Sequence, residues 1–263
     1  MKSDIESFWE DLKEGCGKPR LGKLLAWRSL AKTYDRTSLG IWWIPLDVLF
    51  HFLTIGLVLS LIFEGDGRYL PYFAPSFALW RVFTQSTIRG ADLWNRSENL
   101  LRNFPLPKSL FLVQECGRAF YLFILKFPVA LIITFATGGL FTINIFFLPF
   151  GIIFFLLNLN WIIILFSLIG GRFPDFHRFL PSVMYALYIG SPILWQPERL
   201  GDQYQFIAQL NPIFHLMEVV RRPLLGEAPT LLSWSIVLGL SLVGWTIAFE
   251  AFKRTHREIV LWL

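Results

Sequence analysis

Several ionisable side chains lie in the middle of long apolar stretches of this sequence. Arg81 lies in the second of six such stretches and Lys126 in the third. Ionisable groups at membrane depth are costly and usually face a watery cavity or a charged partner. No acidic residue is evident at the depth of either one, so we expect Arg81 and Lys126 to line a solvated pathway. Asp47 and Arg89 lie nearer one membrane face and are placed to pair between the first two stretches, for packing or for function.

Aromatic side chains accompany these charges at helical spacing. One stripe leads to Arg81 and the other lies in the fifth stretch, and their members are Phe73, Phe77 and Trp80, then Tyr185, Tyr188 and Trp195. Such stripes either pack helices together or contact a ligand, and the sequence leaves both open. Tyr hydroxyls inside a membrane need hydrogen-bond partners, which a hydrated sugar path would supply. The chain holds 27 Phe, 11 Trp and 7 Tyr, which fits either lipid-facing and helix-packing bulk or a conduit whose wall stacks against sugar rings.

The sequence contains no motif for ATP hydrolysis, for zinc binding or for a serine nucleophile. No Gly-rich phosphate loop of the G-x-x-x-x-G-K-S/T type occurs, so the chain by itself is not a recognisable ATPase. The four His residues are scattered without zinc-ligand spacing, and we expect no metal site. No G-x-S-x-G elbow is present, and nothing indicates an enzyme. Cys16 and Cys116 lie far apart in the sequence, and we expect both to be reduced.

The elements that must position these residues are membrane-spanning helices. Of the 263 residues, 54% are hydrophobic and only 16% are charged. Residues 145–170 carry no charge, and as a helix they would exceed the ~30 Å hydrocarbon core of a bilayer. The sequence predicts an all-α integral membrane domain with six spans: Ile41–Phe63, Tyr69–Leu93, Leu110–Thr137, Ile145–Ile169, Phe179–Trp195 and Leu231–Phe252.

Two segments outside these spans have patterns of their own. Residues 1–20 are polar and mixed in charge, which predicts a cytoplasmic tail. Residues 21–37 place Leu24, Trp27, Ala31 and Tyr34 on one face and leave Lys23, Arg28, Lys32 and Arg36 for the polar face, as in a helix lying in the headgroup layer. Residues 203–225 are apolar in patches and broken by Asn211-Pro212, which predicts a hairpin of two short helices that enters the membrane only partway.

The distribution of Lys and Arg predicts the orientation of the chain. Basic residues gather in the N-terminal tail, the second and fourth loops and the C-terminus. The opposite face holds only Arg68, Arg199, Arg221 and Arg222. Because cytoplasmic loops carry the excess of Lys and Arg, we expect both termini in the cytoplasm.

Five stretches together resemble the ABC-2 family of transporter membrane subunits. In family order they are the run from Tyr34 to Pro45 with Ser38-x-Gly40-x-Trp42-Trp43, the loop Asn99–Pro107, the turn Gly171–Phe176, the motif Ser191-Pro192-Ile193-Leu194-Trp195, and Leu210-Asn211-Pro212 with Glu218 and Arg221 behind it. The first stretch is most similar to the branch that exports O-antigen, capsule and teichoic-acid polymers. Asp47 and Pro174 depart from the family pattern.

The resemblance implies partners and roles for several residues. Such subunits form homodimers, and each binds a cytoplasmic ATPase that holds ATP and Mg²⁺, so no cofactor is expected on this chain. Residues 95–107 resemble the coupling helix that enters the ATPase, and its contact residues would be Arg96, Asn99, Leu100, Leu101, Arg102, Asn103 and Phe104. Residues 21–37 would be an interfacial gate helix that carries Trp27, Arg28, Tyr34 and Arg36. Residues 203–225 would cap the external side.

The sequence therefore predicts a permease subunit of an ABC exporter that moves a lipid-linked polysaccharide across the bacterial inner membrane. Its expected partners are a second copy, two ATPase subunits, the glycan and membrane lipids, with no nucleic acid. One alternative keeps the fold but exports a drug or a lipid, since aromatic rings serve apolar drugs equally well. Another alternative is a membrane-embedded enzyme or scaffold without transport activity.

Overall fold

The computed structural model describes residues 4–62, 69–199 and 201–262, and these residues form helices and connecting segments without a strand. Phe63 and Arg68, which entered the predictions above, lie outside that range. The helices are α1 (Asp4–Cys16), α2 (Pro19–Ala31), α3 (Trp43–His51), α4 (Leu57–Ile62), α5 (Tyr69–Ala91), α6 (Leu93–Asn103), α7 (Lys108–Ala136), α8 (Leu148–Arg172), α9 (Pro174–Gly190), α10 (Gln205–Gln209), α11 (Pro212–Leu224) and α12 (Leu231–Thr255).

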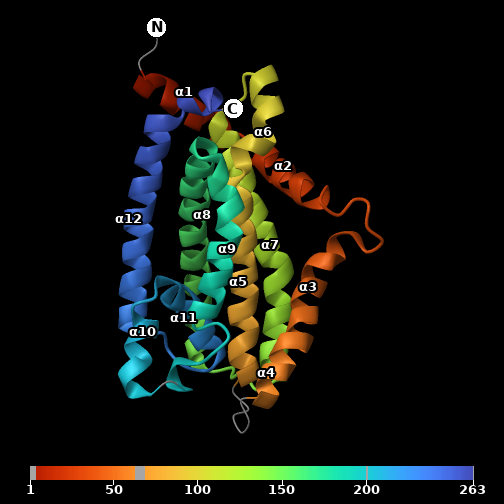
Figure 1. The fold of residues 1–263 in the computed structure, drawn as a ribbon, viewed down its shortest axis with the longest axis vertical. Coiled ribbons are helices and arrows are strands. Elements are labelled where there is room, and N and C mark those ends of the chain that lie inside the picture. Colours follow the sequence, from red (N-terminus) through yellow and green to blue (C-terminus); the bar gives the residue numbers. More distant parts are fainter. Residues whose placement is uncertain (1–3, 63–68, 200, 263) are drawn as a thin grey trace.

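Four helical segments in the described part of the chain are long and apolar enough to cross a membrane. They are Gly40–Ile62, Lys108–Ala136, Ile143–Arg172 and Leu231–Thr255. They confirm the first, third, fourth and sixth predicted spans. Helices α5 and α9 run alongside them in the bundle (Figure 1), but α9 has only 17 residues and α5 includes Arg81 and Arg89. The count of six spans stays a prediction.

The first span is not a uniform α-helix. A short 3-10 turn, Gly40–Trp42, leads into α3, and a π-helical turn, Phe52–Gly56, separates α3 from α4. A π turn uses i→i+5 hydrogen bonds and is rare outside functional or strained positions. The span packs on both α7 and α5, with Ile44 and Val48 buried.

The first and last described elements, α1 and the turn Glu258–Leu261, lie at the same end of the bundle, together with α6 (Figure 1). Helices α10 and α11 lie at the opposite end, where the chain turns into α12. The arrangement agrees with the predicted placement of the two termini on one membrane face.

Residues 1–20 were expected to form a cytoplasmic tail, and the described part of this segment is helical, as α1 and the start of α2. Phe8 is completely buried beside Trp94 and Phe252. Both carboxylate oxygens of Asp11 accept backbone N–H bonds at the start of α7, from Lys108 at 2.7 Å and Ser109 at 2.9 Å. These N–H groups have no partner within their own helix, so α1 supplies the missing acceptor.

The predicted interfacial helix 21–37 begins earlier, ends earlier and turns a different face to the protein. Helix α2 ends at Ala31, and residues 32–39 form turns. Its buried residues are Gly22, Ala26 and Leu30, which lie four apart and approach α7 closely. Leu24 and Trp27, which belong to the predicted apolar stripe, lie off this packed face and are exposed. Small side chains pack here because a Cβ on Gly22 would lie 2.8 Å from Val113.

The fifth predicted span, Phe179–Trp195, also needs correction. Helix α9 starts at Pro174 and ends at Gly190, so residues 191–196 form an irregular segment rather than the end of a helix. The predicted pair of short helices in 203–225 is present as α10 and α11. Asn211 caps α11 by accepting the N–H of Ile213, and Pro212 occupies its first turn, where a missing N–H does no harm.

Close helix contacts in the core occur at glycines of α8 and α12. A Cβ on Gly170 would lie 1.9 Å from the carbonyl oxygen of Ala91, and one on Gly244 would lie 2.2 Å from the Trp161 ring. Asn158 of α8 is buried and donates to Ser241 of α12 at 2.7 Å and to the backbone carbonyl of Val237. Gly and a satisfied amide let membrane helices approach one another closely.

Candidate functional site

A cavity of about 300 Å³ lies between the first span, α5 and α9. Its wall includes five of the residues that the sequence analysis assigned to a conduit or its charges: Phe77, Trp80, Arg81, Tyr185 and Tyr188. The rings of Trp80 and Tyr188 stack with an interplanar angle of 13°. The ring of Phe77 stacks on His51. The two aromatic stripes therefore meet on one cavity, whose polar lining comes from Arg81, the two tyrosines, His51 and Thr84.

The carboxylate of Asp47 lies beside this cavity and pairs with two cations. Nη2 and Nε of Arg81 donate to it at 2.8 and 3.1 Å, and Nζ of Lys126 donates at 2.5 Å. The Nδ1 of His51 lies 3.3 Å from the same carboxylate. Two cations, Arg81 and Lys126, therefore share one carboxylate beside the cavity.

These contacts overturn two expectations. Arg81 and Lys126 were expected to lack an acidic partner, but Asp47 of the first span serves both. Asp47 was expected to pair with Arg89, but Arg89 lies near Glu115 instead, with Nε 3.4 Å from its carboxylate. Asp47 is one of the two residues that depart from the family pattern, and its role is visible only when three helices come together.

Two hydroxyl groups on the cavity wall have no hydrogen-bond partner in the part of the chain that the structure describes. They are Oγ1 of Thr84 and the phenolic oxygen of Tyr188, and both atoms are buried. Most buried polar groups in proteins are paired, and each exception calls for an explanation. Neither oxygen is accessible in this structure, so a ligand hydroxyl could bond to them only after the cavity wall moves.

Three predicted conduit residues lie elsewhere. Phe73 is fully buried and stacks between Tyr69 and Phe77. Lys126 is 1% exposed behind Asp47. Trp195 lies beyond α9, where its Nε1 donates to the backbone carbonyl of Ile189. None of the three lines the cavity.

Helix α6 presents only part of the predicted docking residues at the terminal end of the bundle. Leu100 and Phe104 are 48% and 57% exposed, whereas Leu101 is 7% exposed and packs into the core with Phe8 and Trp94. Asn99, Arg102 and Asn103 are exposed, with Arg102 paired to Glu98 at 3.0 Å. Arg96 turns back to the bundle, toward Asp92 and Glu115. The exposed apolar edge of α6 therefore consists of Leu100 and Phe104.

Beneath α6, three arginines surround one buried carboxylate. Glu115 is 1% exposed and lies within 3.3 to 3.7 Å of Arg89, Arg96 and Arg118. Arg89 also donates to Ser29 of α2 at 3.1 Å. The cluster joins α2, α5, α6 and α7 through charged contacts, so a displacement of α6 would be transmitted to the other three helices.

The predicted gate residues lie along α2 and the turns after it. Trp27 meets Tyr121 of α7 edge to face, with ring centroids 5.3 Å apart. Arg28 and Arg36 are exposed, and Tyr34 is half-buried in the turn that follows the helix. Burial raises the pKa of the Tyr34 hydroxyl above its usual value, so this side chain stays neutral at physiological pH.

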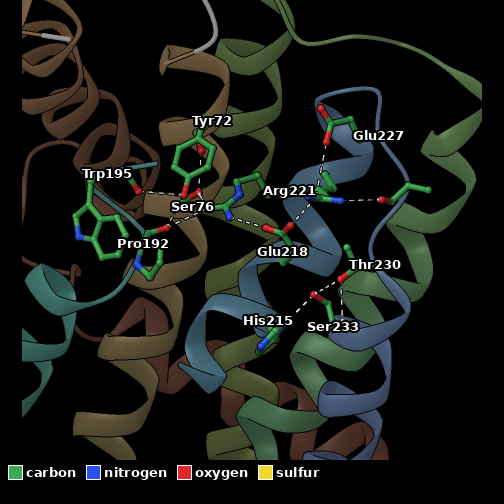
Figure 2. Close-up of polar contacts among 12 residues, drawn as sticks. Tyr72, Ser76, Pro192, Trp195, His215, Glu218, Arg221, Glu227, Thr230 and Ser233 are labelled. Carbon is green, nitrogen blue, oxygen red and sulfur yellow. Dashed lines mark hydrogen bonds and ion pairs between the residues drawn. The ribbon is translucent and has the colours of Figure 1, made fainter. Parts of the chain in front are cut away.

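At the opposite end, Arg221 of α11 fastens the irregular segment 191–196 to the bundle (Figure 2). Its guanidinium donates to the carbonyl of Pro192 at 3.0 Å, to Ser76 at 3.1 Å and to Glu218 at 2.6 Å. It also lies 3.8 Å over the ring of Tyr72, whose hydroxyl donates to the carbonyls of Pro192 and Trp195. Groups from α5, α11 and residues 191–196 thus meet at one buried cation, Arg221, which is 1% exposed.

Sequence reasoning missed this network. It counted Arg221 as a charge on the external face and as part of a family motif, and it assigned Trp195 to the conduit, but it did not bring these residues together. Two features of the sequence could have indicated it. The motif Ser191–Trp195 contains Pro and lacks helical spacing, and Arg221 lies three residues after Glu218. A second contact holds α11 in place, because His215 bonds Ser233 at 2.9 Å and the carbonyl of Gln209 at 2.7 Å (Figure 2).

Within the described residues, no group of three or more His, Cys, Asp or Glu side chains is placed to hold a metal ion. The two cysteines, Cys16 and Cys116, are both free thiols.

Comparison with known proteins identifies the family. The model of the ABC-2 type transporter family matches residues 20–225. The match includes the aromatic cavity, α6 and the Arg221 network. No curated protein matches the chain significantly. Four apolar helices of spanning length and this family match show a membrane-embedded protein. The chain belongs to the ABC-2 type transporter family and is the membrane component of an ABC transporter.

Proposed function

We propose that this subunit exports a lipid-linked polysaccharide across the bacterial inner membrane, driven by a separate ATPase. The observation that supports it is the cavity of stacked aromatic rings, in which Tyr188 and Thr84 hold unpartnered hydroxyls among the described residues. Sugar rings have apolar faces that stack on aromatic side chains and hydroxyl edges that need hydrogen bonds. An apolar drug would satisfy the rings but leave the hydroxyls without partners.

The conduit in this proposal lies between two copies of the chain. The first span exposes Phe50, Leu61 and Ile62, and α9 exposes Phe179 and Tyr185. Both elements border the cavity. Contact between these surfaces in a homodimer would enclose the two cavities along a common path, with Tyr185 facing it.

The driving force in this proposal enters through α6. Leu100 and Phe104 form an apolar edge flanked by Arg102 and Asn103, which suits insertion into a cleft of an ATPase subunit. The Glu115 cluster then links α6 to α5, whose Trp80 and Arg81 line the cavity. At the far end, α10 and α11 act as a re-entrant cap on the external side, with α2 as the cytoplasmic gate and both termini in the cytoplasm.

A deletion strain tests the substrate. Surface polysaccharide and lipid-linked glycan inside the cell are measured together, in a strain with no second exporter. Loss at the surface with accumulation inside supports glycan export. An intact surface glycan contradicts it and moves the function to a drug or a lipid, which a drug-resistance profile of the same strain distinguishes.

Two variants locate the effect at the cavity. Tyr188→Phe removes one unpartnered hydroxyl and keeps the ring, and Trp80→Leu removes the stacking surface. Both are expressed in the deletion strain, with Phe150→Leu on the exposed face of α8 as the matched control. Reduced surface glycan in the first two but not in the control supports the cavity as the glycan path. Copurification of a phosphate-loop ATPase with the wild-type chain separates transport from an enzyme or scaffold, which has no reason to bind one.

A further inference from the structure

A second and larger groove lies apart from the aromatic cavity. It has a volume of about 670 Å³ and is lined by residues of α7, α8 and α12, with α1 and the start of α2 at one end. Pockets for small organic molecules have volumes of roughly 300–1,000 Å³. Within the described part of the chain, the groove takes no lining residue from the first span, α5 or α9, so it has no part in the proposed conduit.

The lining of the groove is almost entirely apolar. Its lining includes Ile153 and Leu157 of α8, Phe120 of α7, and Trp245 and Phe249 of α12. These side chains are all between 36% and 53% exposed. Three of the four segments of spanning length supply this lining, so the groove opens toward the hydrocarbon core of the membrane.

The closed end of the groove has a different character. Leu12 and Cys16 of α1 and Pro19 of α2 close it, and Lys23 of α2 lies on its rim. Lys23 is exposed, and no carboxylate among the described residues pairs with it. Arg20, one turn earlier on the same helix, is also exposed. A long apolar channel therefore ends at a cation in the layer where lipid headgroups lie.

We propose that this groove is a binding site for an anionic glycerophospholipid, with an acyl chain between α7, α8 and α12 and the phosphate at Lys23. The apolar length of the groove accommodates the chain, and the charge of Lys23 selects the headgroup. The bound lipid fills the space between α7 and α12, both of which pack on α8, and it holds α1 and α2 against the spans. The site is independent of the substrate that the conduit carries.

Photo-crosslinking tests this site with the full-length protein in vesicles. The probe is phosphatidylglycerol with a photoactivatable acyl chain, compared with the same probe on phosphatidylcholine, and the labelled peptides are identified by mass spectrometry. We expect adducts of the anionic probe on α8 and α12 at the groove, with weaker labelling by the zwitterionic probe. Lys23→Glu should lower labelling by the anionic probe about fivefold, the size of one basic contact at a membrane surface.

Lys32→Glu is the matched control, because Lys32 lies at the end of the same helix, is exposed and does not line the groove. Its labelling should equal that of the wild type. Ile153→Trp fills the groove and should reduce labelling by both probes, with gel filtration to check the fold. Equal labelling of wild type and Lys23→Glu, equal labelling by the two probes, or crosslinks to a second copy of the chain at this groove would each overturn the proposal.

Discussion

Arg81 of α5 meets Asp47 of the first span through two nitrogens of its guanidinium, at 2.8 and 3.1 Å. The same carboxylate accepts from Lys126 of α7, so one acidic residue joins three helices beside the aromatic cavity. A bidentate Arg–carboxylate contact fixes geometry as well as charge. The position of Trp80, next to Arg81 on α5, thus depends on a residue of the first span.

Replacement of Asp47 should destabilise the protein more than replacement of an exposed acid. Asp47→Asn leaves two cations without a counter-charge, and breaking a fully buried pair costs about 3–5 kcal/mol. The side chain of Asp47 is 22% exposed, so we expect a smaller loss, about 2 kcal/mol. Thermal unfolding of the solubilised protein measures it, with exposed Asp35→Asn as the control. Asp47→Asn combined with Lys126→Met should recover part of the loss, and a double variant no more stable than Asp47→Asn would contradict this account.

The exposed edge of α6 should be separable from its buried face. Leu100→Ala with Phe104→Ala should abolish copurification with the ATPase and leave the thermal stability unchanged, because both side chains are exposed. Leu101→Ala removes a buried side chain of the core and should lower stability by about 2–5 kcal/mol. Equal copurification of the wild type and the first variant would exclude this edge as the docking surface.

The Arg221 network should require a guanidinium rather than a positive charge. Arg221→Lys keeps the charge but loses the planar fork that reaches Ser76, Pro192 and Glu218 together, so we expect a marked loss of stability. Arg221→Met should lose more, about 3–5 kcal/mol, because Glu218 then loses a buried partner. The control is Arg20→Lys, at an exposed position of α2. If the unfolding temperature of Arg221→Lys matches that of the control, the network adds little to the stability of the fold.

Two glycines should respond in opposite directions to the same change. Gly170→Ala places a Cβ 1.9 Å from a backbone carbonyl of α5, and overpacking of this kind costs about 1–3 kcal/mol. A Cβ on Gly239 of α12 would meet no atom of the described residues within 4 Å, so Gly239→Ala should be neutral or slightly stabilising through helix propensity. Thermal unfolding of both variants checks the contrast, and equal losses would refute the packing explanation.

The thiol of Cys16 should react slowly at neutral pH. Burial and the nearby Asp11 carboxylate raise the pKa of Cys16 above its usual value. A raised pKa lowers the thiolate fraction, which is the reactive form, so alkylation should speed up as the pH rises past the usual range for thiols. Cys116→Ser leaves one thiol for the measurement with a water-soluble iodoacetamide. A pH profile that matches a free thiol peptide would contradict the prediction.

The sequence was sufficient for the elements whose signal lies along the chain. Long apolar stretches predict six spans, of which four are found as helical segments of spanning length among the described residues, and Asn211-Pro212 marks the start of α11. Helical spacing also placed residues such as Phe77 and Trp80 on one face, but it left open whether the two stripes pack helices together or contact a ligand. Five of the residues assigned to a conduit or its charges meet at the cavity in the structure.

Contacts between distant segments could not be predicted in the same way. Asp47 finds its partners on α5 and α7, and nothing in its own helix indicates which cations come near. Helix α1 carries so many charges that the burial of Phe8 is hidden in the sequence. The packed face of α2 is made by Gly22 and Ala26. These residues are too small to stand out in a hydrophobic pattern, but their small size lets α7 approach closely.

The π-helical turn at Phe52–Gly56 divides the first span into two parts that differ in phase. Such a turn holds one residue more than an α-helical turn, and one residue corresponds to about 100° of rotation around the axis. The positions that face lipid in Leu57–Ile62 are therefore rotated relative to those in Trp43–His51. A single helical wheel drawn over the whole span therefore assigns the residues of Leu57–Ile62 to the wrong face. In a cysteine scan along the span, the periodic pattern of accessibility should shift near Thr54.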